Sequence, residues 1–438
     1  MAVTTPKDPV TGFGPLNGVL TWVDRRFPLM ALYKEHAADY WAPKNFNFWY
    51  YFGSLAALVL VIQIASGIFL TMNYKPDAAN AFASVEYIMR DVPGGWFIRY
   101  VHSTGASMFF ICVYLHMVRG VMYGSYRKPR ELIWIFGVLI YLSLMGEAFF
   151  GYLLPWGQMS YWGAQVIINL FGTIPFIGEA LAVWIRGDYN VSDATLNRFF
   201  ALHVIALPLV LLGLVGAHLM ALHEVGSNNP DGVEIAKDMD SRSGHPRDGI
   251  PFHPYYTVKD TFGVAVFLIV FSVIVFFSPE VGGYFLEYNN FIPADPLKTP
   301  EHIAPVWYFT PFYAMLRAVP PMFGSQFPGV AVMGAATMIL FLLPWLDRGR
   351  VKSIRYRGTR YRTWFALFVV SFLLLGYLGV EPTTVWGEFS KGLPIVGGDY
   401  IALWAARVLT VVYFLFFLLM PWYTANDNER PEPARVVW

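Results

Sequence analysis

Four histidines are notable because each lies in a stretch of sequence that is otherwise apolar. His102 and His116 share one such stretch, and His203 and His218 share a second. Ionisable side chains are costly inside a bilayer, so histidines at matched depths need a chemical reason. His102 and His116 are 14 residues apart. In a helix this interval is just under four turns, which places both on one face and about 21 Å apart along the axis.

His203 and His218 are 15 residues apart and give a similar rise. Two neighbouring helices with this pattern would bring the histidines together as two pairs, one above the other. Each pair could hold a haem iron between two neutral imidazoles. The alternative is four separate histidines that hydrogen-bond neighbouring helices, but two matched pairs favour the haem interpretation.

The composition indicates a polytopic α-helical membrane protein. The 438 residues are 56% hydrophobic and 14% charged, with a mean hydropathy of +0.45. A net charge of +1 gives no basis for binding nucleic acid. The single cysteine, Cys112, lies inside a predicted span, which argues against a disulfide or a cysteine-ligated cluster within this chain.

Hydropathy predicts an all-α fold with eight transmembrane helices. The predicted spans are Phe46–Met72, Trp96–Tyr123, Leu132–Pro155, Leu196–His223, Thr257–Phe277, Gly329–Leu346, Thr363–Val380 and Tyr400–Trp422. The segment 73–95 is predicted to be a loop with a turn at Pro93. Two longer segments, 156–195 with two short amphipathic pieces and 278–323, are predicted to be loops.

These spans predict three parts. Residues 1–45 would form an interfacial segment, with a surface helix that includes Asp24–Phe27 and Tyr33–Tyr40. Residues 46–224 would form a four-helix bundle around two haems. Residues 225–438 would supply the other four helices.

Basic residues predict the orientation. The loop 347–362 carries seven Lys and Arg residues against one Asp, and the loop after the second span carries Arg127, Lys128 and Arg130. Both loops and both termini are therefore expected in the cytoplasm. Spans two and four then run parallel, which pairs His102 with His203 near the outer face and His116 with His218 near the inner face.

Glycines give a second signal. Gly53 and Gly67 in the first span, and Gly137 and Gly151 in the third, are each 14 residues apart. A haem plate between helices needs close backbone approach, which glycine permits. The alternative is ordinary packing of helices through small residues.

Two arginines, Arg99 and Arg119, each lie three residues from a histidine. Guanidinium groups bind carboxylates in a bidentate manner, so both are candidates for the haem propionates. The alternative is that each reaches toward the lipid headgroups.

The interval of 15 residues predicts an irregularity in the fourth span. One extra residue rotates a side chain by about 100° in a regular helix. Pro208 lies between the two histidines and removes a backbone hydrogen bond. We therefore predict a kink or a one-turn π-bulge near residues 202–213, which returns both histidines to one face.

Four further motifs accompany the histidines. They are Gly151-Tyr-Leu-Leu-Pro-Trp-Gly-Gln-Met-Ser160, Ser227-Asn-Asn-Pro230, Ile250-Pro-Phe-His-Pro-Tyr-Tyr256 and Pro305-Val-Trp-Tyr308. Together with the histidines they resemble cytochrome b of the cytochrome bc1 complex, the quinol:cytochrome c oxidoreductase. The resemblance covers essentially the whole chain and is to the undivided bacterial form.

The resemblance implies a Q-cycle subunit with two non-covalent b haems, the outer of low and the inner of high potential. Quinol would be oxidised at an outer site and quinone reduced at an inner site, with protons moved across the membrane. It also implies a Rieske iron–sulfur protein, cytochrome c1, ubiquinone and membrane lipid as partners, a homodimeric complex, and the bacterial inner membrane as location.

The resemblance also implies site residues. The outer quinol pocket would use Phe149, Tyr152, Trp162, Gly163, Pro305, Trp307, Tyr308 and Tyr313. The inner quinone site would use His223, Ser227, Lys259 and Asp260. For the last two, a solvated pair at the membrane interface is the alternative.

The chain departs from the family pattern where the family carries a glutamate thought to accept a quinol proton. Val306 stands there and cannot accept one. Glu147, in the outer half of the third span, is the expected substitute, because a carboxyl at that depth is a functional candidate. The alternatives are Glu301, or a Glu147 that is protonated and bonded to a neighbouring helix. The interval of 15 in the fourth span also departs from the usual 14 and matches photosynthetic relatives.

Two other classes remain open from the sequence. One is the haem-bearing membrane anchor of a quinone-linked dehydrogenase, and the other is a multi-span transporter with structural histidines. A reduced-minus-oxidised spectrum with two b haems would exclude the transporter. Antimycin-sensitive reduction of cytochrome c would exclude the anchor.

Overall fold

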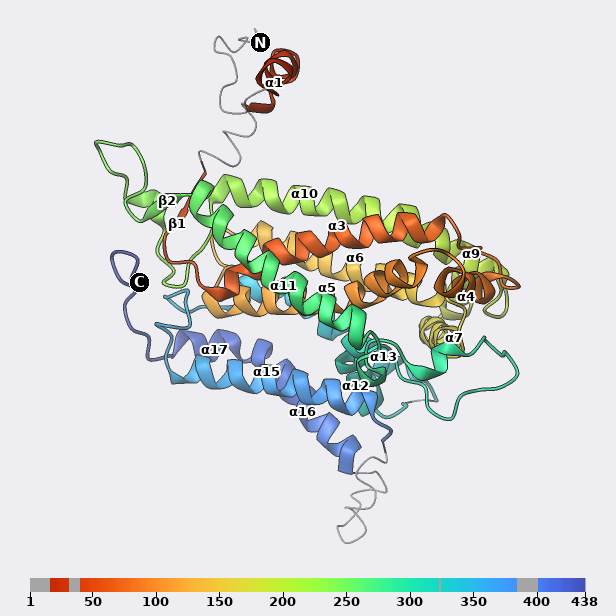
Figure 1. The fold of residues 1–438 in the computed structure, drawn as a ribbon. Coiled ribbons are helices and arrows are strands. Elements are labelled where there is room, and N and C mark those ends of the chain that lie inside the picture. The colour runs from red at the N-terminus through yellow and green to blue at the C-terminus, as the bar shows by residue number, and fades with distance from the viewer. Residues whose placement is uncertain (1–15, 31–39, 323, 384–400, 438) are drawn as a thin grey trace.

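The computed structural model describes residues 16–30, 40–322, 324–383 and 401–437, and most of its long helices run side by side (Figure 1). Within these residues eight helices are long and apolar enough to cross a membrane, which confirms the predicted fold. They are Phe48–Thr71, Gly95–Tyr123, Glu131–Leu153, Asp193–Val225, Phe252–Phe277, Phe327–Leu346, Thr359–Val380 and Ile401–Leu418.

Four helices of the first half form a bundle. They are α3 (Tyr51–Thr71), α5 (Gly95–Tyr123), α6 (Glu131–Leu153) and α10 (Leu207–Val225). Helix α3 packs against α5, and α6 packs against α10. Half of the α5 span is buried, against 11% of the span that ends in α10, so α5 is central and α10 is peripheral.

The fourth span is not a single α-helix. It begins as α9 (Asp193–Ala201), passes through a π-helical turn at Leu202–Ala206 and continues as α10. The Leu207 N–H donates to the Leu202 carbonyl, a bond that spans five residues. The predicted π-bulge is therefore confirmed, and it starts one residue before His203.

The second half packs alongside the bundle. Its helices are α11 (Thr257–Phe277), α12 (Thr310–Ala318), α13 (Phe327–Met338), α14 (Leu343–Leu346), α15 (Thr359–Val380), α16 (Ile401–Leu418) and α17 (Met420–Ala425). Short α12 contacts α13, α15 and α16. The Trp134 indole of α6 donates to the Leu340 carbonyl at 2.8 Å, which joins the two halves.

Shorter elements cover the two ends of the bundle. Helices α7 (Gln158–Gly172) and α8 (Gly178–Arg186) are the two predicted amphipathic pieces and lie at one end, at the right of Figure 1. At the other end β1 (Trp41–Pro43) pairs with antiparallel β2 (Gly249–Pro251). We call these the α7 end and the β1 end. Single turns of 3-10 helix lie at Phe48–Tyr50, Ile235–Lys237, Val281–Gly283, Tyr288–Phe291, Trp307–Phe309 and Ile339–Leu342, and a π turn lies at Phe252–Tyr256.

Several sequence predictions were wrong in detail. Helix α4 (Ala81–Arg90) lies in the segment predicted to be a loop, because Ala81, Ser84 and Ile88 supply a short buried face. Helix α12 likewise lies in the predicted loop 278–323. Helix α1 (Asn17–Asp24) precedes the predicted surface helix at Asp24–Phe27. The predicted piece Tyr33–Tyr40 lies outside the described residues except for Tyr40.

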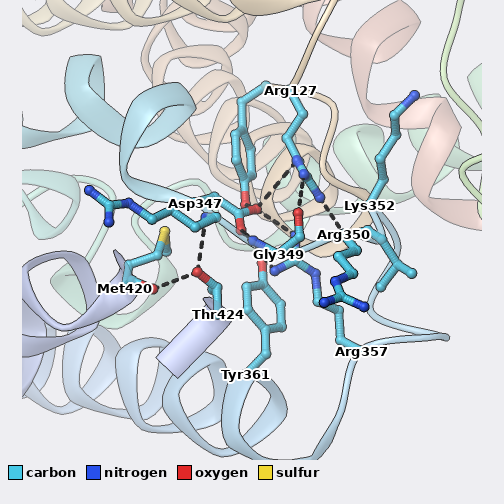
Figure 2. A network of polar contacts seen from close by, with 12 residues as sticks. Arg127, Asp347, Gly349, Arg350, Lys352, Arg357, Tyr361, Met420 and Thr424 are labelled. Carbon is cyan, nitrogen blue, oxygen red and sulfur yellow. Dashed lines mark hydrogen bonds and ion pairs between the residues drawn. The ribbon is translucent and has the colours of Figure 1, made fainter. Parts of the chain in front are cut away.

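A buried ion-pair network joins the two halves at the β1 end (Figure 2). The Asp347 carboxylate accepts from the Arg357 guanidinium at 2.9 and 2.5 Å and from the Tyr126 hydroxyl at 2.7 Å. Arg127 approaches the same carboxylate at 3.7 Å. Burial alone would raise the pKa of the Asp347 carboxyl, but the two arginines hold it below its usual value. The two basic loops therefore lie at one end of the bundle.

Replacing Asp347 with Asn should destabilise the fold, because it leaves buried Arg357 without a counter-charge. Loss of one partner of a buried ion pair costs about 3–5 kcal/mol of unfolding free energy. The measurement is the unfolding midpoint in detergent. Glu86→Gln is the control, because its partner Arg90 is 75% exposed and such pairs contribute less than about 1 kcal/mol. Equal midpoints for the two variants would contradict this role.

Candidate functional site

The four histidines meet as two pairs along the bundle. The rings of His102 and His203 have centroids 6.1 Å apart, and those of His116 and His218 are 6.3 Å apart. The pairing predicted from parallel spans is therefore confirmed. Two metal–imidazole bonds of about 2 Å each, with the two ring radii, put centroids roughly 6 Å apart. Both gaps are thus wide enough for a metal ion bound by the two rings.

Hydrogen bonds orient the rings of the His102–His203 pair. The Ser66 hydroxyl donates to the Ile62 carbonyl at 2.7 Å, so its oxygen can accept from His102 Nδ1 at 2.9 Å. His203 Nδ1 lies 2.9 Å from the Glu147 carbonyl and 3.0 Å from Glu147 Oε1. An Nδ1–H that donates leaves the lone pair on Nε2 free to bind a metal.

Each of the four predicted glycines faces one histidine ring. A Cβ at Gly53 would lie 3.0 Å from His116 Cε1, and a Cβ at Gly67 would lie 3.3 Å from His102 Cε1.

The other two glycines differ in tightness. A Cβ at Gly137 would lie 3.5 Å from His218 Cε1, an ordinary contact, whereas one at Gly151 would overlap the His203 ring. The histidines approach the helix backbones this closely because side chains are missing there.

The two predicted arginines lie beside different pairs. Arg119 Nη2 is 3.3 Å from His116 Nδ1, and its guanidinium lies 4.8 Å from the Tyr50 ring centroid. Its buried Nε has no hydrogen-bond partner among the described residues. A buried guanidinium with an unused donor suits an anionic group. Arg99 lines a cavity beside the His102–His203 pair.

This cavity, of about 260 Å³, connects the His102–His203 pair to the Pro305–Tyr308 motif. Its wall is mainly apolar, as in most sites for small organic ligands. Residues that line it include Gly67, Ser107, Phe110, Gly151, Tyr152, Phe285, Leu286, Asn290, Val306 and Tyr308.

The predicted outer-site residues divide into two groups. Tyr152 and Tyr308 line the cavity, and a Cβ at Gly163 would lie 3.7 Å from the Tyr152 ring. Pro305 is partly buried and adjoins the cavity residue Val306. Trp307 donates to the Ser107 hydroxyl at 3.0 Å and so ties the motif to α5.

The remaining three make other contacts. Phe149 packs on Phe199, the Trp162 indole donates to the Asp295 carbonyl, and the Tyr313 ring lies under Arg317.

The predicted inner-site residues lie at the β1 end around the segment 40–46. The Tyr40 hydroxyl is 2.9 Å from the Ser227 hydroxyl, and its ring lies 5.0 Å from the His223 ring. Lys259 donates to the Phe46 carbonyl at 2.8 Å. Asp260, the next residue, lies in the first turn of α11. Sequence reasoning missed Tyr40, which carries no motif.

Two acidic residues at the α7 end make contacts that the sequence did not predict. The carboxyl of Glu147 contacts His203, which is a candidate metal ligand. Glu287, which sequence reasoning missed, accepts from the Tyr152 hydroxyl at 2.8 Å. Burial raises the pKa of Glu287 to about 7. A lone acid in a long loop gives no sequence signal, because only the fold brings it to Tyr152.

The fold and the site together define a class, helical membrane proteins whose spans carry paired histidines that could hold a metal ion. The family model for cytochrome b/b6/petB matches residues 37–226, and that for cytochrome b (C-terminal)/b6/petD matches residues 293–391. Cytochrome b of Allochromatium vinosum is 61% identical over 420 residues, which cover 95% of this chain and 98% of the relative. Cytochrome b of Rickettsia bellii is 50% identical and covers 99% of both chains.

A solved structure titled "Hyperthermophilic respiratory Complex III" contains a chain that superposes with a TM-score of 0.81 at 38% identity. The match covers 92% of this chain and 98% of that one. The chain belongs to the cytochrome b family.

Gly151→Ala should disrupt the site at His203, because the added methyl overlaps the ring. We expect the spectrum of the outer haem to be lost while that of the inner haem remains. Gly213→Ala in α10 is the control, because a Cβ there meets nothing within 4 Å. A normal two-haem spectrum in purified Gly151→Ala would show that the helix shifts to make room.

Proposed function

We propose that this chain is the di-haem subunit of a proton-translocating quinol:cytochrome c oxidoreductase. It oxidises quinol at a site near the α7 end and reduces quinone at a site near the β1 end, as in a Q cycle. The observation that carries this proposal is the cavity that runs from the His102–His203 pair to the Pro305–Tyr308 motif.

Two b-type haems would supply a one-electron relay across the membrane, where a free charge is costly. His102 and His203 would ligate the outer, low-potential haem, and His116 and His218 the inner, high-potential one. The separations of 6.1 and 6.3 Å support both assignments.

Six other residues would serve the haems. Arg99 and Arg119 would bind propionates. Gly53, Gly67, Gly137 and Gly151 would leave the space that the rings and the haem edges need.

The outer site would bind quinol in a wall of apolar side chains that excludes water. Tyr152 and Tyr308 supply its polar edge, with Gly163 behind Tyr152. Bonds from α5 fix the motif, because Tyr114 donates to the Tyr308 carbonyl at 2.6 Å and Trp307 donates to Ser107. Because α5 carries His102 and also holds the motif, it would set the distance between bound quinol and His102.

Other predicted residues would shape the outer site less directly. Phe149 lies in α6 with Tyr152 and packs on Phe199, and Trp162 donates to the Asp295 carbonyl. Pro305 and Tyr313 flank Tyr308 along the chain.

The inner site would use His223, Ser227, Lys259 and Asp260, and we add Tyr40. These groups lie at the β1 end with the basic loops, where proton uptake from the cytoplasm is expected. The Tyr40 hydroxyl lies 2.9 Å from that of Ser227, and its ring lies 5.0 Å from the His223 ring at a tilt of 51°, so Tyr40 would position the two polar groups that meet quinone.

The basic loops at the β1 end also support an orientation in the membrane. Arg127 of one basic loop contacts Asp347 of the other, so both loops share a side, which we assign to the cytoplasm. The chain would lie in a bacterial inner membrane with both termini inside.

The proposed partners follow from the family and the match to a respiratory Complex III. They are a Rieske iron–sulfur protein, cytochrome c1, ubiquinone, lipid and a second copy of the complex.

The assembled complex tests this function directly. Purified complex should reduce cytochrome c with ubiquinol as donor, and antimycin should block the reaction. Two b haems without this activity would favour the anchor of a quinone-linked dehydrogenase.

Replacement of the histidines should remove one haem at a time. His116→Ala or His218→Ala should abolish the inner haem signal, and His102→Ala or His203→Ala the outer one, because each imidazole supplies one of two axial bonds. Reduced-minus-oxidised spectra at controlled potential separate the two signals. Two normal haems in any of these variants would refute the ligand assignment.

Glu147 has two competing roles. The sequence suggested a quinol proton acceptor, but its contact with His203 supports a role in tuning the outer haem. Glu147→Gln replaces a carboxyl 3.0 Å from His203 Nδ1 with an amide and should therefore shift the outer haem potential. Redox titration measures it. An unchanged potential with lost quinol oxidation would restore the proton-acceptor role.

A further inference from the structure

The cavity wall contains few groups that could take a proton from quinol. Among the described residues that line it, the ionisable ones besides tyrosine are Arg99, His102, His203 and Glu147. Arg99 is a cation, the two histidines face each other as a pair, and Glu147 contacts His203. Val306, on the motif side, is apolar and only 4% exposed. Under the proposed function, a base is needed that the wall itself does not supply.

Glu287 does not line the cavity but is bonded to a residue that does. The hydroxyl of Tyr152, which lines the cavity, donates to Glu287 Oε2 at 2.8 Å. The residue before it, Leu286, lines the cavity and is 8% exposed, whereas the residue after it, Tyr288, is 64% exposed. The carboxyl therefore lies at the boundary between the cavity and the surface of the α7 end.

The local charges suit a group that gains and loses a proton near neutrality. Burial raises the pKa of Glu287 to about 7, and the Tyr152 hydrogen bond offsets part of that effect. The titratable groups that face it are Tyr152 from α6 and Tyr308 from the 3-10 turn of the motif. The carboxyl is thus more basic than one in water, and a tyrosine hydroxyl links it to the cavity.

We propose that Tyr152 and Glu287 form the proton exit of the quinol site and replace the acid that is absent at Val306. One quinol O–H bond breaks as its proton moves to the Tyr152 oxygen, while the Tyr152 proton moves to Glu287 Oε2. The second quinol proton leaves toward the iron–sulfur partner. One electron would leave to that partner and one to the haem that His102 and His203 would hold, so that quinol becomes quinone. Glu287 then releases its proton past Tyr288 to the outer aqueous phase.

Other acids at this end fit the role less well. Glu301 is exposed, and its segment lies outside the cavity wall. Asp295 is exposed and adjoins the Trp162 contact. Glu287 alone among these three shares a hydrogen bond with a cavity residue within the described chain.

The test uses the whole assembled complex with an inhibitor of the inner site, and it follows outer-haem reduction by ubiquinol across the pH range. In the wild type the rate should rise with pH through about 7, because only ionised Glu287 accepts a proton. Glu287→Gln should lower the rate at least tenfold and abolish that rise, since a positioned base contributes about 10²–10⁴-fold. Glu301→Gln is the matched control in the same loop and should keep both rate and profile.

Two further variants separate chemistry from folding. Glu287→Asp should recover part of the rate, and Glu287→Gln combined with Val306→Glu should recover pH-dependent turnover from a different position. The haem spectra and the ubiquinol dissociation constant should stay near wild type in Glu287→Gln. An unchanged pH profile in Glu287→Gln would overturn the proton exit alone. A wild-type complex that does not oxidise ubiquinol would instead overturn the proposed function.

Discussion

The close approach of imidazole rings to helix backbones is the constraint on which the rest of this structure depends. Two pairs of rings, 6.1 and 6.3 Å apart, face each other across the bundle from α5 and the fourth span. Glycines on α3 and α6 then let those helices close around the rings. The tight fit of Gly151 on His203 and the looser fit of Gly137 on His218 indicate that the position of His203 is the more constrained of the two.

The π turn at Leu202–Ala206 is a consequence of that constraint. In a regular α-helix an interval of 15 residues would place His203 about 60° around the helix from His218, and about 100° from where an interval of 14 would place it. The wider turn absorbs the extra residue, and Pro208, which cannot donate a hydrogen bond, lies just beyond it. The same turn brings His203 Nδ1 to the Glu147 carbonyl, so the local irregularity also orients the ring.

The parts that were predictable from sequence are those set by periodicity. Hydropathy predicted the eight spans. The histidine spacing predicted both pairs and the π-bulge, because the number of residues between two side chains fixes their relative height and face on a helix. The missed features depend on contacts between distant segments. Helix α4 and α12 are too short for a hydropathy signal, and Tyr40 and Glu287 acquire their partners only when loops fold back. A contact between residues 135 positions apart, such as Tyr152 with Glu287, has no local pattern.

The cavity proposed to bind quinol belongs to neither half of the chain alone. Its floor comes from α5 and α6 of the first half, and its motif side comes from the loop of the second half, held by Trp307 to Ser107 and by Glu287 to Tyr152. At the opposite end Asp347 joins the halves through buried arginines. These contacts at both ends of the bundle leave the Pro305–Tyr308 motif little freedom to move relative to the paired histidines. Under the proposed proton exit, a carboxyl can then act from the loop instead of from position 306, because Val306 lines the cavity and Glu287 is bonded to Tyr152, which also lines it. The proposed proton exit thus depends on how the two halves meet. An acid at position 306 is one of several ways to place a carboxyl beside the cavity.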